Sequence, residues 1–374
     1  MKQTMSLDFT SIPVLDFSQT KSPATKPIFL AELQNALVKV GFFYIKNHVI
    51  PEDIQTELIR HSVRFFDLPT EKKLEVDMVN SRHYLGYVRV GNEKSSEKID
   101  YRETFTLGMD NPAPGPDEPL YYNMVGPGQW PDESSIPGFR QAVRNYLSAV
   151  HRLAGEFKVL VAEALDLEPT ALLRFFNDRP GDRFKLIKYP QPSSISSKGE
   201  EEGQEGFSGI GPHKDGTFLT FLLQGTAHSG LEIQNKRGEW IPAQPIPGTL
   251  VVNIGRMFEA LTGGICTATT HRVNLREENF VDEAGNLLGP RYSFPMFLPF
   301  RLDLAESEMP LKMPDHIVDS VRGEKVESDA RGMSQAVYNV QVGDGVFMGS
   351  AIKHPRVAHR WYPEILARSQ AASI

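Results

Sequence analysis

The stretch Gly211-Pro-His-Lys-Asp-Gly216 decides the fold, because it runs directly into the apolar, β-prone segment Thr217-Phe-Leu-Thr-Phe-Leu-Leu223. Side chains two residues apart on an extended strand point to the same side, so His213 and Asp215 are expected to face one point. A second imidazole, His271, lies in another short β-type segment. Two neutral imidazoles and one carboxylate on one face of a metal leave the opposite positions open. The three residues therefore predict a non-haem Fe(II) site that binds an organic substrate and O2 side by side.

Taken one at a time, the same residues have ordinary explanations. His213 and Asp215 would be turn residues at the surface, and His271 would be a core histidine. Their combination with the motifs that flank them favours metal binding. Iron is expected in place of zinc, because three protein ligands leave room for a bidentate co-substrate and O2.

Matching motifs extend on both sides of this pair, from about Ile12 to about Phe300. They are Ile12-Pro-Val-Leu-Asp-Phe-Ser18, Val40-Gly-Phe-Phe-Tyr-Ile-Lys-Asn-His48, Lys185-Leu-Ile-Lys-Tyr-Pro190, Pro247-Gly-Thr-Leu-Val-Val-Asn-Ile-Gly255, His271-Arg-Val273 and Arg291-Tyr-Ser293. Through these motifs the chain resembles the iron- and 2-oxoglutarate-dependent dioxygenases of the isopenicillin N synthase-like branch. The resemblance implies Fe(II) as the metal, with 2-oxoglutarate and O2 as co-substrates.

Arg291 and Ser293 form an Arg-x-Ser pair on a predicted strand, so a guanidinium and a hydroxyl converge on one point. A planar guanidinium matches a carboxylate bidentately, and such a charge-assisted pair is strong in a dry pocket. The family resemblance implies that the pair holds the distal carboxylate of 2-oxoglutarate while the 2-oxo acid end chelates iron. A surface arginine paired with an acidic loop is less consistent with the apolar residues of the same strand, such as Phe294 and Met296.

Tyr189 ends a predicted strand on the same face as Lys185 and Ile187. The family often has Asn where Ile187 stands, in an Asn-x-Tyr pattern near the co-substrate, and only the tyrosine is kept here. Its hydroxyl is a candidate donor to a carboxylate, and a core aromatic with one satisfied hydrogen bond is the alternative. Isopenicillin N synthase resembles the chain at these positions too, and it uses the equivalent residues for a substrate carboxylate without 2-oxoglutarate.

The segment Asp100-Tyr-Arg-Glu-Thr-Phe105 resembles the part of the family that lines the substrate side of the cavity. It makes Arg102 a candidate substrate residue, although Arg102 and Glu103 are also candidates for structural ion pairs. Phe105 and Phe297 are candidate pocket walls, and core packing explains each of them equally well.

The pattern along the chain predicts a mainly β fold with flanking helices. From Arg183 onward, short β-prone runs alternate with turns, which is typical of a jelly roll, or double-stranded β-helix. A long helix is expected from Phe139 to Asp166, as a brace against the outside of a sheet. Residues 191–209 are rich in Ser, Gly and Glu, and we expect them to form a mobile loop beside the metal site.

Four regions follow from this pattern. Residues 1–110 form an N-terminal α/β region that packs on the core, and residues 111–182 an extended linker with bracing helices. Residues 183–300 form the catalytic jelly roll, and residues 301–374 a C-terminal extension that completes the core.

Composition limits the classes of function. The net charge is −7, and no basic face typical of nucleic-acid binding is visible. Cys266 is the only cysteine, which favours a reducing compartment. No apolar run reaches the length of a membrane span, and the N-terminus lacks the layout of a signal peptide. We therefore expect a cytoplasmic protein with a small-molecule substrate, no nucleic-acid or membrane partner, and an oligomeric state that the sequence leaves open.

Three functions are compatible with the motifs, the predicted fold and the composition. The first is an oxygenase that couples oxidative decarboxylation of 2-oxoglutarate to hydroxylation, desaturation or ring closure of a small organic metabolite, in specialised metabolism. The second is an iron oxidase of the isopenicillin N synthase kind, without 2-oxoglutarate. The third is a non-catalytic jelly-roll binding protein, against which the intact metal triad argues. The first is the function we predict.

Overall fold

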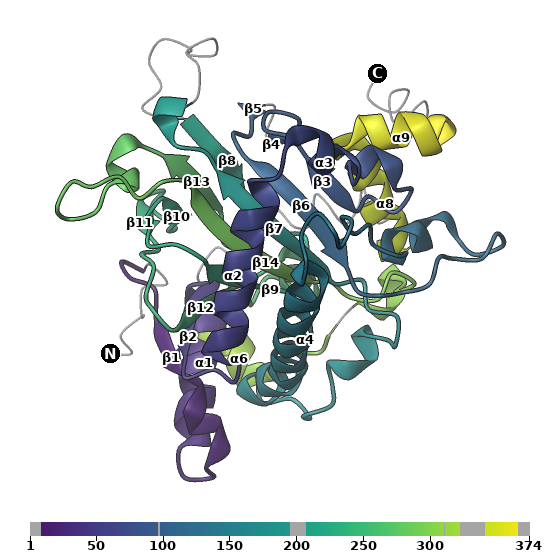
Figure 1. Ribbon diagram of the computed structural model, residues 1–374. Helices are drawn as coiled ribbons and strands as arrows, with labels where there is room; N and C mark the ends of the chain where they lie inside the picture. The colour runs from purple at the N-terminus through teal and green to yellow at the C-terminus, as the bar shows by residue number, and fades with distance from the viewer. Residues whose placement is uncertain (1–8, 96–97, 195–206, 310, 322–340, 366–374) are drawn as a thin grey trace.

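Two β-sheets form the centre of the protein. The computed structural model describes residues 9–95, 98–194, 207–309, 311–321 and 341–365. An eight-stranded sheet has the order β1-β2-β12-β9-β14-β7-β6-β3, and a four-stranded sheet has the order β11-β10-β13-β8 (Figure 1). Side chains from both sheets share one buried cluster, so the two sheets face each other across it. The predicted jelly-roll fold with flanking helices is confirmed.

The elements within these residues have the following bounds. The strands are β1 (Val14–Asp16), β2 (Phe42–Lys46), β3 (Gly86–Val88), β4 (Lys94–Ser95), β5 (Lys98–Ile99), β6 (Glu103–Gly108), β7 (Arg183–Tyr189), β8 (Phe207–His213), β9 (Leu219–Gln224), β10 (Leu231–Gln234), β11 (Trp240–Pro242), β12 (Thr249–Ile254), β13 (His271–Leu275) and β14 (Arg291–Leu298). The α-helices are α1 (Lys26–Lys39), α2 (Glu52–Phe66), α3 (Thr70–Leu74), α4 (Phe139–Ala164), α5 (Arg256–Leu261), α6 (Asp315–Ser320), α8 (Val342–Lys353) and α9 (Pro355–Trp361). Short 3-10 turns connect several of them, including Met78–Asn80 and Leu120–Val125.

Each strand of the large sheet divides its side chains between two environments, because successive residues point to opposite faces. In β7, Phe184 and Leu186 belong to the apolar cluster on the helix side of the sheet. Ile187 and Tyr189 belong to the cluster between the two sheets. Lys185 shares their parity and faces the same interior. The parity of a residue on its strand therefore decides whether it packs against helices or lines the space between the sheets.

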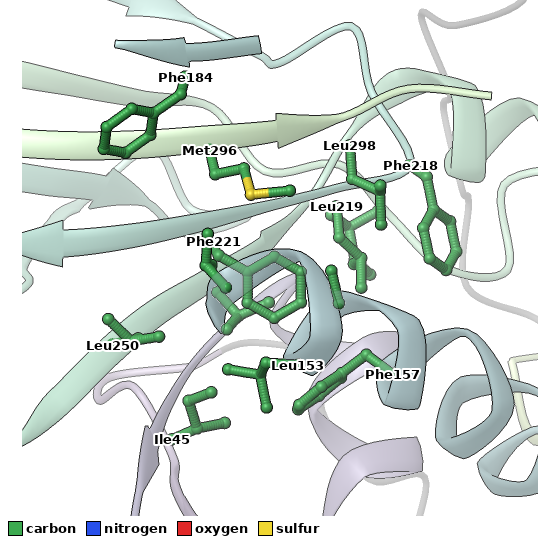
Figure 2. Packing of buried hydrophobic residues seen from close by; sticks show 14 of the residues in the cluster. Ile45, Leu153, Phe157, Phe184, Phe218, Leu219, Phe221, Leu250, Met296 and Leu298 are labelled. Carbon is green, nitrogen blue, oxygen red and sulfur yellow. The ribbon is translucent and has the colours of Figure 1, made fainter. Parts of the chain in front are cut away.

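The long helix α4 braces the outer face of the large sheet, as expected (Figure 1). Figure 2 shows Leu153 and Phe157 of this helix against Leu219 and Phe221 of β9. The ring centroids of Phe157 and Phe221 lie 5.4 Å apart in an edge-to-face contact. Fully burying each such side chain contributes roughly 1.5–3 kcal/mol. This apolar layer holds the sheet rigid from behind and leaves its other face for the site.

The N-terminal region contributes directly to the large sheet. Strand β2 pairs with β12, and β6 pairs with β7, so strands from the first third of the chain flank those of the predicted catalytic region on both sides. At the other end of the chain, α8 and α9 pack beside β3 in a separate cluster that includes Tyr84, Phe347 and Tyr362. No helix among the described residues is both long and apolar enough to cross a membrane.

Two local expectations need correction. Asp215 does not lie on a strand with His213, because β8 ends at His213 and the chain turns before β9 begins at Leu219. The segment expected as a loop over residues 191–209 ends inside β8, which begins at Phe207. Residues 195–206, where most of the expected loop falls, lie outside the described residues.

Phe105 is not a wall of the substrate pocket. It is fully buried at 0% exposure on the helix side of β6. Its ring stacks on Phe65 of α2 with centroids 4.6 Å apart and lies 6.1 Å from the ring of Phe139 in α4. The prediction failed because Phe105 has the opposite parity on β6 to Thr104 and Thr106, and these two threonines face the interior.

We predict that Phe105→Ala lowers the free energy of unfolding by about 3–5 kcal/mol, because it leaves a cavity in a closely packed aromatic layer. Metal affinity of the folded variant should stay at the wild-type value, since the side chain lies behind the sheet. Denaturant unfolding and metal titration measure the two quantities. Phe297→Ala, on the interior face and partly exposed, should cost less stability. Equal losses in the two variants would contradict this packing.

Candidate active site

His213, Asp215 and His271 come together as a compact group. His213 ends β8, His271 begins β13, and the two are register partners in the small sheet. Their ring centroids lie 4.2 Å apart. The Nε2 atoms of His213 and His271 lie 3.7 Å and 3.8 Å from Oδ1 of Asp215. Within the described part of the chain, this is the group of His, Cys, Asp or Glu side chains arranged to hold a metal ion.

Backbone carbonyls orient both imidazoles. Nδ1 of His213 lies 2.9 Å from the carbonyl oxygen of Gly211, and Nδ1 of His271 lies 3.1 Å from that of Thr269. A carbonyl oxygen only accepts, so each Nδ1 carries the proton and donates it. Each Nε2 therefore presents its lone pair to the shared centre, which is the arrangement of metal-binding histidines.

The two carboxylate oxygens of Asp215 have different partners. Its Oδ2 accepts hydrogen bonds from Oγ1 of Thr220 at 2.6 Å and from Nδ2 of Asn253 at 2.8 Å. Its Oδ1 faces the two imidazoles. The two donors fix the plane of the carboxylate and leave one oxygen for a metal ion.

The charge states of the group also suit a metal. Burial lowers the pKa of His213 to about 3, and the neighbouring His271 adds to this effect, so the His213 ring is neutral near pH 7. Burial raises the pKa of Asp215, but the two imidazoles and the hydrogen bonds to Oδ2 outweigh it, and the pKa is lowered. A neutral imidazole beside a carboxylate, with open positions opposite, is a donor set that fits Fe(II).

Backbone hydrogen bonds from the residues after β12 hold the chain at and after Asp215 in place. The backbone N–H of Arg256 donates to the carbonyl of Asp215 at 2.7 Å, and that of Gly255 donates to the carbonyl of Phe218 at 3.0 Å. A Cβ at Gly255 would lie 2.1 Å from the carbonyl oxygen of Thr217. Only glycine permits this approach, so Gly255 helps to place the Asp215 carboxylate.

Arg291 lies in the interior beside Tyr189, its register partner on β7. Arg291 is 2% exposed, and its guanidinium carbon lies 4.9 Å from the centre of the Tyr189 ring. Burial lowers the pKa of Arg291, and a hydrogen bond to Tyr189 opposes this shift. Its Nη1 has no hydrogen-bond partner among the described residues. Ser293 is buried two residues along the same strand face.

Tyr189 connects Arg291 to Arg102. Its hydroxyl also accepts a hydrogen bond from Arg102, across the β6–β7 edge. A Cβ at Gly209 would lie 2.8 Å from the Tyr189 ring, so the ring packs closely against the backbone of β8. Tyr189 is therefore both a buried aromatic and a hydrogen-bonded member of the site, which combines the two alternatives left open by the sequence.

Arg102 and Phe297 are the other two residues that the sequence suggested for substrate contact on the interior side. Arg102 faces the interior and also forms buried ion pairs, with Glu93 Oε2 at 3.1 Å and Asp100 Oδ2 at 3.0 Å. Phe297 shares the strand face of Arg291 and Ser293 and is partly exposed. Substrate contact by Arg102 and Phe297 stays a prediction.

Comparisons with known proteins identify the family. Residues 12–133 match the family model for the N-terminal region of the non-haem dioxygenase in morphine synthesis. Residues 184–298 match the model for the 2OG-Fe(II) oxygenase superfamily. A 2-oxoglutarate-dependent dioxygenase of Gibberella zeae is 44% identical over 97% of this chain and 94% of its own length. The chain belongs to the 2OG-Fe(II) oxygenase superfamily.

Two further proteins similar to this chain are associated with small molecules. Homoarginine-6-hydroxylase 2-ODD-233 of Oryza sativa is 34% identical over 72% of this chain and 82% of its own length. The crystal structure of a full-length Neurospora crassa protein in complex with alpha-KG and thymine is 25% identical, with a TM-score of 0.66, over 85% of this chain and 98% of that one. Membership makes this oxygenase an enzyme that uses Fe(II), 2-oxoglutarate and O2 on a small metabolite, and the oxidase without 2-oxoglutarate is not favoured.

The oxygenase has a further set of interior polar residues that the sequence did not single out. Glu93 is 1% exposed, and its carboxylate lies 3.6 Å from the ammonium group of Lys185 and 3.9 Å from Nε2 of His354. Thr104 and Thr106 are buried on the interior face of β6. A signal was present for Lys185 alone, because it has the parity of Ile187 and Tyr189, which point into the interior. Glu93 and His354 carried none, since they come from a loop and from the junction of α8 and α9.

We predict that Thr220→Val lowers metal affinity by about 10- to 100-fold, because it removes a hydrogen bond that orients a ligand carboxylate. The fold should be kept, since valine has nearly the shape of threonine. Titration of Fe(II) under anaerobic conditions measures the affinity. Thr249→Val is a matched control, because its buried hydroxyl donates only to the carbonyl of Ile246, away from the site. Equal affinity in the two variants would show that the Thr220 hydrogen bond does not act on the ligand.

Proposed function

We propose that His213, Asp215 and His271 hold Fe(II), and that Arg291 binds the distal carboxylate of 2-oxoglutarate together with Ser293 and Tyr189. The observation that carries the proposal is the convergence of three potential metal-ligand atoms in the interior. Both Nε2 atoms and Oδ1 of Asp215 converge on one point.

The Arg291 guanidinium supports the assignment of the co-substrate. A buried guanidinium with an unsatisfied N–H is costly unless a ligand supplies an acceptor. The distal carboxylate of 2-oxoglutarate supplies two acceptors in the planar geometry that arginine matches. Ile187, where the family often has Asn, offers no polar group, so we assign the carboxylate to Arg291, Ser293 and Tyr189.

Bound iron would supply the oxidising chemistry, with 2-oxoglutarate and O2 as co-substrates. The chain itself positions and shields the reactants. Phe42 packs edge-to-face on His271, with ring centroids 5.1 Å apart, and closes the side of the ligand toward the core. Arg102, which precedes β6, is close enough for its charge to lower the pKa of His213, and a substrate held by Arg102 would lie near the metal.

We propose hydroxylation of a small organic metabolite in specialised metabolism as the reaction. The Oryza relative named as a homoarginine-6-hydroxylase supports hydroxylation over desaturation or ring closure. We also propose a cytoplasmic location and no nucleic-acid partner. The net charge of −7 and the single cysteine, Cys266, support these two points.

His271→Ala should reduce iron affinity and abolish turnover while the fold survives, because two protein donors remain. The measurements are bound iron and succinate release with substrate. His83→Ala is the control, because it removes a buried imidazole whose Nδ1 lies against the carbonyl of Asn123, outside the ligand group. Wild-type turnover with stoichiometric iron in His271→Ala would show that the triad assignment is wrong.

Arg291→Lys should raise the concentration of 2-oxoglutarate needed for half-maximal succinate release, and leave that for the main substrate nearly unchanged. Loss of a buried bidentate pair typically costs about 2–5 kcal/mol, or roughly one to four decades in affinity. Arg272→Lys makes the same exchange on β13, where the arginine pairs with Glu232 outside the site. If both variants respond to 2-oxoglutarate like the wild type, Arg291 does not bind it.

A further inference from the structure

A polar compartment lies at the β6–β7 side of the interior, beyond Tyr189. Thr106 and Lys185 are register partners on these two antiparallel strands, and Thr104 pairs with Ile187. Directly opposed residues on one face have Cβ atoms about 4.5–5.5 Å apart. The Lys185 ammonium group and the hydroxyls of Thr104 and Thr106 therefore belong to one small interior surface.

Several buried polar atoms of this surface lack hydrogen-bond partners within the described residues. The two oxygens of Glu93 are among them, but they pair with the charges of Arg102 and Lys185. Oγ1 of Thr104, Oγ1 of Thr106 and Nε of Arg102 are buried, and none has a hydrogen-bond partner within the described ranges. Buried polar groups in native proteins are nearly always paired with protein, water or ligand. Three donors beside a lysine match a ligand group that accepts hydrogen bonds.

The charges of the compartment favour the same kind of ligand. Three cations, Arg102, Lys185 and Lys353, act on it against two carboxylates, Glu93 and Asp100. Glu93 is already shared among its neighbours, since Arg102 and Lys185 lie 3.1 Å and 3.6 Å from its oxygens. Its role is to hold these two cations in place, and a further anion would balance the excess of positive charge.

Lys185 shows the effect of this excess. Burial lowers its pKa to about 7, Glu93 opposes the shift, and the positive charges of Lys353, Arg102 and Arg183 add to it. An anion beside the ammonium group would reverse these contributions and keep Lys185 charged.

We propose that Lys185, Thr104, Thr106 and Arg102 form a subsite that binds a carboxylate group of the substrate, so that the substrate of this oxygenase is a small carboxylic acid. The inference rests on the proposed function, because it assumes that the substrate lies beside iron held by His213, Asp215 and His271. An uncharged heterocycle such as thymine would leave Glu93 as the carboxylate that Lys185 and Arg102 share.

The subsite lies on the same strand as Tyr189 and some distance from it. Lys185 lies four residues from Tyr189 along β7, which corresponds to roughly 13 Å. The subsite is therefore separate from the residues assigned to the distal carboxylate of 2-oxoglutarate.

The experiment measures how the enzyme distinguishes an acid from its amide. Enzyme with Fe(II) and saturating 2-oxoglutarate, without O2, is titrated calorimetrically with aliphatic and amino-acid carboxylates, homoarginine included, and with the primary amide of each. Saturating 2-oxoglutarate keeps the probes away from Arg291. The acid that binds most tightly should do so at least about tenfold better than its amide, which is the effect of one charge-assisted contact.

Lys185→Met should reduce this ratio to near one, and Lys185→Arg should retain most of it. Thr106→Val should reduce the ratio by a smaller factor, and it tests the subsite even if Lys185→Met folds poorly. Lys188→Met is the matched control, because Lys188 lies on the opposite face of β7 near Asp67 and Glu103. The control should keep the wild-type ratio.

Acid binding by the wild type should also weaken as the pH rises through about 7, while amide binding stays constant. The other charged groups that act on Lys185 are Glu93, Arg102, Arg183, Lys353 and His354. Burial lowers the pKa of His354 to about 3 and that of Arg183 to about 10. This pH dependence of acid binding should disappear in Lys185→Met.

The subsite is overturned if no acid in the panel binds better than its amide, or if the ratio survives in both Lys185→Met and Thr106→Val. These outcomes leave the iron and 2-oxoglutarate assignments intact, because 2-oxoglutarate binding is measured first on the same enzyme. Failure of the proposed function appears separately, as turnover retained in His271→Ala.

Discussion

The register between β8 and β13 is the constraint on which the rest of the site depends. It places His213 opposite His271, and a shift of one residue would turn one imidazole away from the other. The backbone carbonyls of Gly211 and Thr269 then select the same tautomer in both rings. The turn to Asp215 completes the group only because β12, through Gly255, clamps the chain that follows. Strand pairing brings the two imidazoles to one point, and a turn held by backbone hydrogen bonds from Gly255 and Arg256 adds Asp215.

The large sheet has two faces with opposite energetic roles. Its outer face packs aromatic and aliphatic residues against α4 and α2, and this burial stabilises the fold (Figure 2). Its inner face carries Arg291, Arg102 and Lys185, with buried donors that the protein leaves unpaired. Such groups cost stability until a ligand satisfies them. The apolar face thus offsets an inner face whose buried charged groups we assign to 2-oxoglutarate and substrate.

Local patterns predicted much of this arrangement. The short β-prone runs indicated the jelly roll, and the Arg-x-Ser spacing placed Arg291 and Ser293 on one face, where the structure has them. The same alternation explains the error at Phe105, because its parity on β6 depends on where pairing with β7 begins, and the sequence does not state that register. Asp215 was expected on a strand, but β8 ends at His213, so its convergence on the imidazoles comes from a turn held by distant residues.

The sequence by itself determined the family, the metal-ligand types and the class of chemistry, because these follow from short spacings along one or two strands. Only the tertiary structure decided which charged residues share the interior. Glu93, Lys185 and His354 lie far apart in the chain, and they meet because the β3 edge, β7 and the α8–α9 junction pack together. No local pattern encodes such a meeting, since burial and pairing of charges depend on long-range contacts. The chemistry of the substrate side is therefore a property of the fold, and the chemistry of the metal is a property of the motifs.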